Sequence, residues 1–191
     1  MDKNNENEIK DKAEETSDIR AEIYEWLSCL VSTLVICVLT FVFFARVIGV
    51  VGESMLPTLH PSDRIVISNF LYTPKQGDIV VFRKLSFRYD PLVKRVIATE
   101  GQVVDIDFSR GIVIVDGVEL EEDYTAALTL SKQNFVGPVT VPAGQLFVMG
   151  DNRNNSMDSR DDKVGFVDKR YVMGKVYFRV MPFSDIGSVY K

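Results

Sequence analysis

The chain has 191 residues, 46% of them hydrophobic, and a formal net charge of −5. This length accommodates one globular domain of ordinary size with small additions. Residues 1–25 contain four basic and nine acidic side chains and carry the whole net charge, which leaves the remainder neutral. No basic surface is implied, so we expect no nucleic-acid partner.

The first segment of the chain is polar. Residues 1–18 have few apolar side chains and no aromatic ones. Such a segment cannot bury enough apolar surface to offset the chain entropy lost on folding. We expect residues 1–25 to form a mobile, acidic, cytoplasmic tail that becomes helical near residues 19–26.

An apolar run follows. Leu27 to Ala45 are 19 residues without a charge, between Trp26 and Arg46. As a helix they would extend roughly 29 Å, close to the hydrocarbon thickness of a bilayer. A buried core helix and a cleaved secretory signal are the alternatives, but the run is longer than the apolar region of a signal and follows an acidic tail. We predict an uncleaved transmembrane helix over residues 26–46.

The positive charges on the two sides of the run indicate its orientation. Lys10, Lys12 and Arg20 precede it, whereas Arg46 and Arg64 follow within a similar distance. The side richer in lysine and arginine usually stays in the cytoplasm. This comparison favours a single-pass protein of the cell membrane with a cytoplasmic N-terminus and an extracytoplasmic domain over residues 47–191.

Both cysteines of the chain, Cys29 and Cys37, fall within the apolar run. Eight residues apart on one helix, they are too distant along its axis for a disulfide, so we interpret them as packing residues. The large domain has no cysteine and can therefore exist in an oxidising compartment without disulfide chemistry.

Beyond the run the pattern changes to short β-branched and aromatic stretches separated by Gly, Pro, Asp and Asn. Seven such stretches are present: residues 64–70, 77–83, 91–99, 102–108, 111–120, 144–151 and 165–183. They predict a mainly β fold, an antiparallel β-sheet domain after a single N-terminal helix. FSRG at 108–111 and VDGV at 115–118 are interpreted as hairpin turns. We expect residues 102–145 to form a peripheral hairpin and loop insertion with nothing catalytic in it.

Ser54 is a candidate nucleophile in the stretch GVVGESMLPTLHPSD, residues 49–63. A serine hydroxyl attacks an acyl group only when a base accepts its proton. His60 is the one histidine of the chain, but a Ser/His pair also needs an orienting carboxylate, and a surface position in the Leu-His-Pro turn is the alternative interpretation.

Lys94 is the second candidate for the base. In PLVKRVIAT, taken as a strand, Leu92, Lys94 and Val96 share one face, so the lysine projects into an apolar stripe. Burial there would lower the pKa of its amine toward neutrality, whereas Arg95 cannot deprotonate. The alternative is a lysine at a sheet edge with its charge in water.

Four segments, GESMLPTL (52–59), GDIVVFR (77–83), KRVIATEGQ (94–102) and GDNRNNSMDSRDDKVGFV (150–167), follow the apolar run in this order. They resemble the signature boxes of bacterial type I signal peptidases, which are membrane-anchored Ser/Lys proteases. The resemblance extends from the apolar run to about Phe183 and is to the minimal, Gram-positive-like form.

The resemblance implies a role for each matching residue. Ser54 matches the nucleophile, Lys94 the general base, and Ser156 the serine that orients the lysine amine. The other matches are Asp158, Arg160 and Arg95, which brace the site, and Met55 and Pro57, which follow the nucleophile and contact substrate.

Two local features refine this interpretation. Some homologues carry serine in place of Gly52, so here the oxyanion donors are expected from the backbone of Ser54 and Gly52. A carboxylate touching the lysine would raise its pKa, so Asp158 is expected to pair with Arg160 or Arg153. The loop 150–162, taken alone, is also compatible with a solvated turn.

The activity implied is removal of signal peptides from exported preproteins, cutting after small-x-small residues near the bilayer surface. No cofactor is expected, and a single histidine with the cysteines in the span leaves no zinc site.

A catalytically inactive, membrane-tethered β-domain that binds exported proteins is the alternative. Self-cleaving Ser/Lys repressors would need a DNA-binding module, for which residues 1–25 are too short and acidic, and eukaryotic-type signal peptidases carry histidine where this chain has Lys94. Nothing in the sequence indicates an oligomeric state.

Overall fold

A computed structural model describes residues 20, 22–39, 45–84 and 88–190 of the chain. It contains two compact units, Met1–Phe43 and Phe44–Lys191, which are treated separately below. The predicted tail lies almost entirely outside the described residues.

Within its described residues, the first unit contains one helix, Glu22–Leu39, long and apolar enough to cross a membrane by its length and composition. Its side chains are exposed within the unit, and Cys29 and Cys37 are both free thiols. Helical structure begins within residues 19–26, as expected, and Glu22 lies near its start, where acids complement the helix dipole. The predicted end is wrong, since Arg46 is already in a strand; residues 40–44 lie outside the described part.

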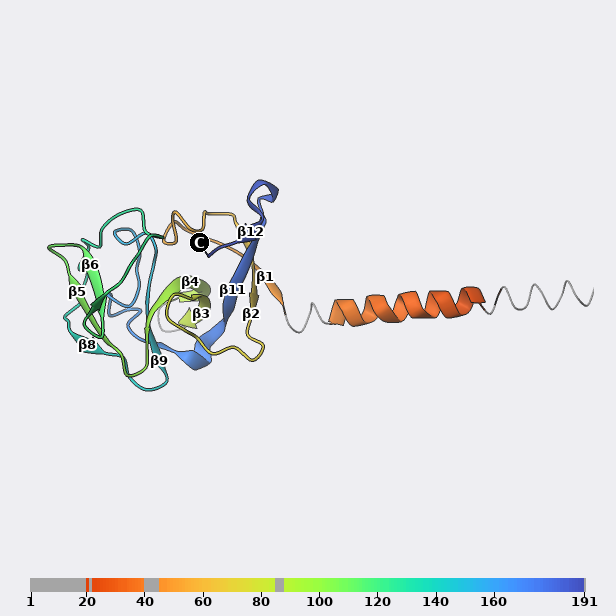
Figure 1. The fold of residues 1–191 in the computed structure, drawn as a ribbon, viewed down its shortest axis with the longest axis horizontal. Coiled ribbons are helices and arrows are strands. Elements are labelled where there is room, and N and C mark those ends of the chain that lie inside the picture. The colour runs from red at the N-terminus through yellow and green to blue at the C-terminus, as the bar shows by residue number, and fades with distance from the viewer. Residues whose placement is uncertain (1–19, 21, 40–44, 85–87, 191) are drawn as a thin grey trace, which may run out of the picture. The chain divides into compact units, whose positions relative to one another are not determined.

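The second unit is built on an antiparallel sheet. Among the described residues its strands run in the order β1-β2-β11-β3-β4-β9-β10, and β12 pairs with β11. Figure 1 shows β3 and β4 between the strands β1 and β2 on one side and β9 on the other. The bounds are β1 (Arg46–Gly49), β2 (Arg64–Ser68), β3 (Ile79–Lys84), β4 (Arg88–Thr99), β9 (Gln145–Met149), β10 (Val167–Asp168), β11 (Val172–Met181) and β12 (Gly187–Ser188).

A smaller antiparallel sheet has the order β7-β6-β5-β8. Its strands are β5 (Val103–Asp107), β6 (Ile112–Val115), β7 (Val118–Glu119) and β8 (Val139–Thr140), and two 3-10 turns, η1 (Lys169–Tyr171) and η2 (Phe183–Asp185), lie elsewhere in the domain. Both predicted hairpin turns are confirmed: residues 108–111 join β5 to β6, and Asp116 and Gly117, both with positive φ, join β6 to β7. Positive φ at both central residues is the geometry of a tight hairpin turn.

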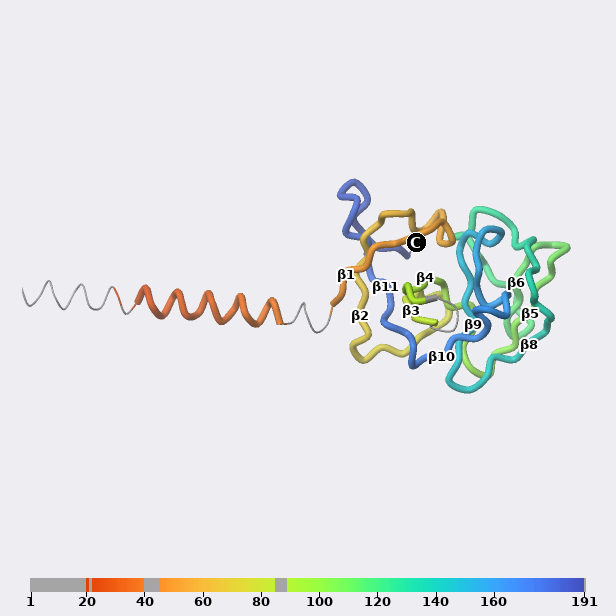
Figure 2. Tube along the Cα trace, turned by 180° about the vertical axis from the view of Figure 1, so that it is seen from behind, coloured from red at the N-terminus to blue at the C-terminus, as the bar shows by residue number. Residues whose placement is uncertain are grey.

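The smaller sheet shares a core with the larger one. Val104 and Val113 cluster with Ile97, Phe147 and Met149 of β4 and β9. Both views place β5, β6 and β8 beside β9 (Figure 2). Residues 102–145 are thus a packed layer rather than a peripheral insertion, because the alternating side chains of β5 and β6 point into the same interior as β4.

The mainly β, antiparallel fold is confirmed, and each of the seven predicted stretches contains at least one strand. Three short strands were missed. β1 reads as the end of the apolar run, whereas β8 and β12 have two residues each, too few to show a period of two.

We expect Phe135→Ala to lower the free energy of unfolding by about 3–5 kcal/mol, since a buried aromatic side chain leaves a cavity when truncated. Phe135 is buried and packs edge-to-face on Phe108 and Phe147. Chemical denaturation of the full-length protein in detergent measures the change. Phe183→Ala, at a side chain 76% exposed, is the matched control and should cost far less. Equal effects would contradict a shared core.

Candidate active site

Ser54 lies in a closed turn between β1 and β2. The N–H of Val50 donates to Asp63 and that of Ser62 donates to Val50, which fixes the two ends of the turn. Within it, Leu59 donates to the carbonyl of Met55 at 2.9 Å, and both side chains are buried in the core. The serine is therefore carried by a rigid part of the backbone.

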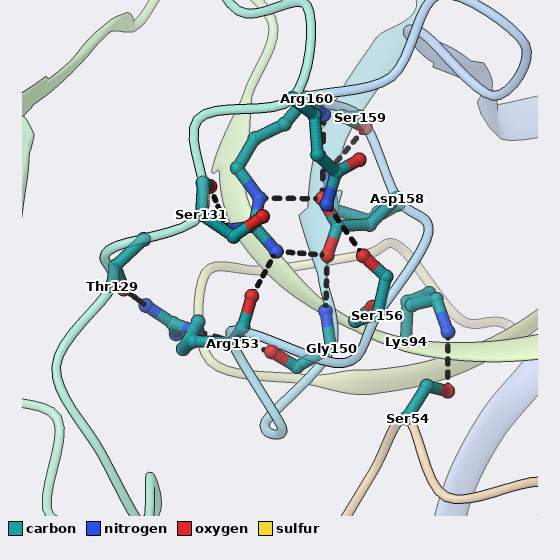
Figure 3. A network of polar contacts seen from close by, with 12 residues as sticks. Ser54, Lys94, Thr129, Ser131, Gly150, Arg153, Ser156, Asp158, Ser159 and Arg160 are labelled. Carbon is teal, nitrogen blue, oxygen red and sulfur yellow. Dashed lines mark hydrogen bonds and ion pairs between the residues drawn. The ribbon is translucent and has the colours of Figure 1, made fainter. Parts of the chain in front are cut away.

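Lys94 approaches this turn from the middle of β4. Its partner across the sheet is Val80 of β3, which is fully buried, and Lys94 itself is 3% exposed. Its Nζ and the Oγ of Ser54 are joined by a hydrogen bond of 2.5 Å (Figure 3). The predicted nucleophile and base, forty residues apart in the chain, are thus in direct contact.

The surroundings of the amine make it easier to deprotonate than an exposed lysine. Burial lowers the pKa of Lys94 from the ordinary value of 10.5 to about 8, against opposing effects of Asp158 and Asp151. Both carboxylates are occupied by arginines: Asp158 contacts the Nε of Arg160 at 2.8 Å, and Asp151 contacts the Nη2 of Arg95 at 2.7 Å. Because arginine stays protonated, each pair reduces the field that its carboxylate exerts on the lysine.

The loop after β9, which we call the site loop (residues 150–160), is held by buried polar contacts. The N–H of Gly150 donates to Asp158, and its carbonyl accepts from Nε of Arg153 at 3.0 Å. Arg160 donates to the carbonyl of Arg153 and to Asp158, as Figure 3 shows. Arg153, Asp158 and Arg160 are each at most 1% exposed, so the interpretation of this segment as a solvated turn does not hold.

The site loop is bonded to the serine turn. The N–H of Asn152 donates to the carbonyl of Ser54 at 3.0 Å, and its side-chain amide donates to the carbonyl of Glu53 at 3.1 Å. Thr58 donates to Asp151, the partner of Arg95. These bonds fix the position of the turn relative to β4 and hence to Lys94.

Ser156 lies at this junction, but its expected hydrogen bond to Lys94 is not formed. Its Oγ is buried and has no partner among the described residues. A side chain at Gly150 would collide with the Oγ of Ser156 and the carbonyl of Ser54, so only glycine allows the loop to approach the serine this closely. Ser156 is therefore adjacent to the serine turn and free to accept a bond.

A groove of about 750 Å³ leads to the pair and is lined by Ser54 and Lys94 together with the apolar side chains of Ile48, Val50, Val51, Met55, Leu92, Val93 and Met157. Met55 lines this groove. Pro57 does not: it lines a separate cavity with Arg95 and Tyr124. The turn brings Met55 and Leu59 to the same side, which directs the residue midway between them to the other.

Two contributions to the site were missed from the sequence, those of Asn152 and Gly150. Asn152 bonds the serine turn through its backbone N–H and its side-chain amide, a contact that residue type alone does not predict, and the contact of Gly150 depends on the fold. Leu92 was placed on the same strand face as Lys94, and only its position in the wall of the groove is new. His60 lies outside the groove, in an exposed turn near Met181 and Asp185.

In the described part of the chain, no group of three or more His, Cys, Asp or Glu side chains could hold a metal ion. The polar centre of the site is a serine and an amine bonded to each other, which is an arrangement for acyl transfer through a serine ester.

Residues 23–181 match the family described as signal peptidase, peptidase S26. The chain belongs to this family. As a member of the signal peptidase family it is a serine endopeptidase, and the apolar helix fits a membrane anchor.

Two relatives known by name, one from Synechocystis and one from Bacillus amyloliquefaciens, agree with this assignment. "Probable signal peptidase I-1" of Synechocystis is 38% identical over 177 residues, which cover 87% of each chain. Signal peptidase I of Bacillus amyloliquefaciens is 34% identical over 188 residues, 93% of this chain and 98% of that protein. A solved signal peptidase I from Enterococcus faecalis is 32% identical, with a TM-score of 0.44, and covers 55% of this chain and 97% of that one.

Burial of Lys94 has a cost that a substitution can reveal. Because its pKa is about 8 in the folded protein and 10.5 when exposed, the unfolded chain binds more protons between these pH values. The cost is therefore complete below pH 8 and fades as the pH rises to 10.5. We expect Lys94→Met to raise the free energy of unfolding at pH 7 by about 3 kcal/mol, and the gain to shrink by pH 10.

Denaturant titrations of the full-length protein at pH 7 and pH 10 measure this difference. Lys163→Met removes an exposed lysine and is the matched control. A Lys94→Met protein less stable than wild type at pH 7 would show that the amine is stabilised by partners rather than penalised by burial.

Proposed function

We propose that this membrane-anchored endopeptidase removes signal peptides from exported preproteins, with Ser54 as nucleophile and Lys94 as general base. The hydrogen bond of 2.5 Å between Ser54 Oγ and the buried Lys94 Nζ carries the proposal. Neutral lysine accepts a proton and protonated lysine does not, so the lowered pKa of Lys94 is what makes it a base.

The reaction begins when the lone pair of Lys94 accepts the hydroxyl proton of Ser54 and Oγ attacks the carbonyl carbon of the scissile bond. The resulting ammonium then donates this proton to the nitrogen of the leaving peptide as the C–N bond breaks, which leaves an ester on Ser54. In the second half, Lys94 takes a proton from water, the hydroxide attacks the ester, and the released Ser54 oxygen recovers the proton. Lys94 gives back each proton that it accepts, so the reaction consumes water and needs no other reagent.

The negative oxygen that forms during attack needs hydrogen-bond donors. Among the described residues the backbone N–H of Ser54 has no acceptor, and Gly52, with φ of 84°, lies two residues earlier in the same turn. We assign the oxyanion donors to these backbone groups, in line with the absence of a side-chain hydroxyl at Gly52. Ser156 Oγ accepts an N–H of Lys94 once the amine is protonated and has three donors to satisfy.

The groove supports a preference for small residues before the cut. Ile48, Met55 and Leu92 are apolar side chains in its wall, and Lys94 and Ser54 close it at one point. The groove also carries Glu53, Asp90 and Asn155 in its lining, and we place the residue before the cut against the apolar side chains, which favour small apolar groups. An alanine-type residue at the first and third positions before the cut fits this setting.

Cleavage of a purified preprotein by the full-length enzyme tests the dyad. Ser54→Ala and Lys94→Ala should each lower kcat/KM by about 10⁴-fold or more, as loss of a catalytic-triad member does. His60→Ala is the control and should leave cleavage unchanged. The wild-type rate should rise about tenfold per pH unit below an apparent pKa near 8 and then level off, since only the neutral amine is active.

Undiminished cleavage by the Lys94→Ala protein would exclude the base assigned here. Absence of cleavage by the wild type, with preprotein binding retained, would favour the inactive, membrane-tethered binding domain instead. A fall of the rate on loss of His60 would move the base to that residue.

For topology we propose that the acidic N-terminal segment is cytoplasmic and the catalytic domain extracytoplasmic. Lys10, Lys12 and Arg20 outnumber Arg46 and Arg64 in the flanks of the helix. Protease added to spheroplasts should digest the domain and spare a tag at the N-terminus. Survival of the domain until the membrane is permeabilised would reverse the orientation.

A further inference from the structure

A segment outside the signature boxes runs along the site loop. We call residues 122–135 the strap; it follows β7 in the chain and ends at Phe135, which is buried in the core between Phe108 and Phe147. Because its end is fixed in the interior, the strap has a defined position beside residues 150–160.

The strap first binds Arg153 of the site loop. Both carboxylate oxygens of Glu122 accept from this guanidinium at 2.6 Å, and Thr129 Oγ1 accepts at 3.2 Å. The ring of Tyr124 lies 3.8 Å from the guanidinium carbon of Arg95 and 5.7 Å from that of Arg153. The strap therefore links the loop to the residue that follows Lys94 on β4.

Further along, the strap continues as a series of backbone contacts. Asn154 Oδ1 accepts the N–H groups of Leu130 and Ser131, both at 3.0 Å. Arg160 donates to the carbonyl of Ser131 at 2.8 Å and accepts the N–H of Asn134 through its own carbonyl at 3.1 Å. Figure 3 shows Thr129 and Ser131 facing Arg153 and Arg160 across this boundary.

Gln133 is the member of the strap that reaches Ser156. Its Nε2 donates to the backbone carbonyl of Ser156 at 2.6 Å. Gln133 adopts φ of 51°, a left-handed conformation that a side chain of this size rarely takes. The backbone is thus held in an uncommon form at the point from which the amide contacts Ser156.

A second observation sets this pair apart. Among the described residues, the only buried side-chain polar atoms without a partner are Gln133 Oε1 and Ser156 Oγ. An unpaired buried oxygen destabilises the fold, and a Met or Leu at 133 would fill the space without that cost. A glutamine is expected there only if its N–H group does something that an apolar side chain cannot.

We propose that Gln133 is a positioning residue for catalysis, which holds Ser156 through its carbonyl so that Oγ can accept from the Lys94 ammonium. The inference rests on the proposed function, in which Ser156 receives that bond. Ser156 Oγ lies against Gly150, whose other neighbour is the carbonyl of Ser54, so a small displacement of Ser156 changes the acceptor next to the reacting pair. Gln133 touches neither substrate nor the reacting atoms.

The test is a double-mutant cycle on preprotein cleavage with the full-length enzyme. Gln133→Met, which keeps the length of the side chain and removes its donor, should lower kcat about tenfold with KM unchanged. If Gln133 acts only through Ser156, the double variant with Ser156→Ala should be no slower than Ser156→Ala alone. Losses that multiply would overturn the proposal.

The pH profile distinguishes positioning from a merely structural contribution. Loss of an acceptor for the ammonium destabilises the charged form, so the acid limb of the rate profile should shift to lower pH in Gln133→Met and in Ser156→Ala alike. If the acid limb does not move and kcat falls only as much as the folded fraction of the protein, Gln133 has a structural role and does not position Ser156. If the methionine variant does not fold, Gln133→Glu replaces it. The glutamate keeps the shape of the side chain but places a carboxylate against the carbonyl of Ser156, and its rate at pH 8 is compared with that of the wild type in the same way.

Gln102→Met is the matched control, because the Nε2 of Gln102 also donates a hydrogen bond, to Asp116, at a distance from the site. It should retain the kinetics and pH profile of the wild type. The dyad is tested separately: cleavage that survives Ser54→Ala or Lys94→Ala refutes the proposed function, whereas a fully active Gln133→Met enzyme with an essential dyad refutes only the role of Gln133.

Discussion

The site depends on a lysine kept out of water without an anion at its amine. Lys94 sits in the middle of β4, opposite fully buried Val80, and its nearest polar partner is the hydroxyl of Ser54. Two carboxylates close enough to affect its pKa are each turned to an arginine. Two features of the domain meet this requirement. The apolar sheet buries the amine, and the buried ion pairs keep negative charge away from it.

The ion pairs also form the framework of the site loop. Buried arginine and aspartate pairs stabilise little in net terms, because desolvation opposes their attraction, but removing one partner is costly. Arg95, Arg153 and Arg160 therefore make the geometry of residues 150–160 specific rather than simply stable. Each also bonds to a backbone carbonyl or a strap residue, so hydrogen bonds connect the loop to the strap, and the pair of Arg95 with Asp151 connects it to β4.

The sequence predicted what local chemistry and periodicity encode. Strand character, the hairpin turn at Asp116 and Gly117, and the apolar setting of Lys94 follow from residue types and spacing. The contact of Ser54 with Lys94 was reached through the resemblance, since forty intervening residues carry no information on their distance. Pro57 was misplaced because position in a motif does not say which side of a turn a residue takes. The predicted end of the apolar helix was wrong because absence of charge was used to define it, whereas Arg46 already lies in β1.

The strap could not be predicted, because its polar side chains resemble those of any exposed loop until their partners are known. The bond from the N–H of Asn152 to the carbonyl of Ser54 is a still clearer case, since it involves main-chain atoms alone. Transplanting a serine and a lysine onto another β scaffold would reproduce the reactive atoms without this link. A designed hydrolase of this type would need the loop as a structural unit, copied with its glycine and its backbone path rather than as a set of side chains.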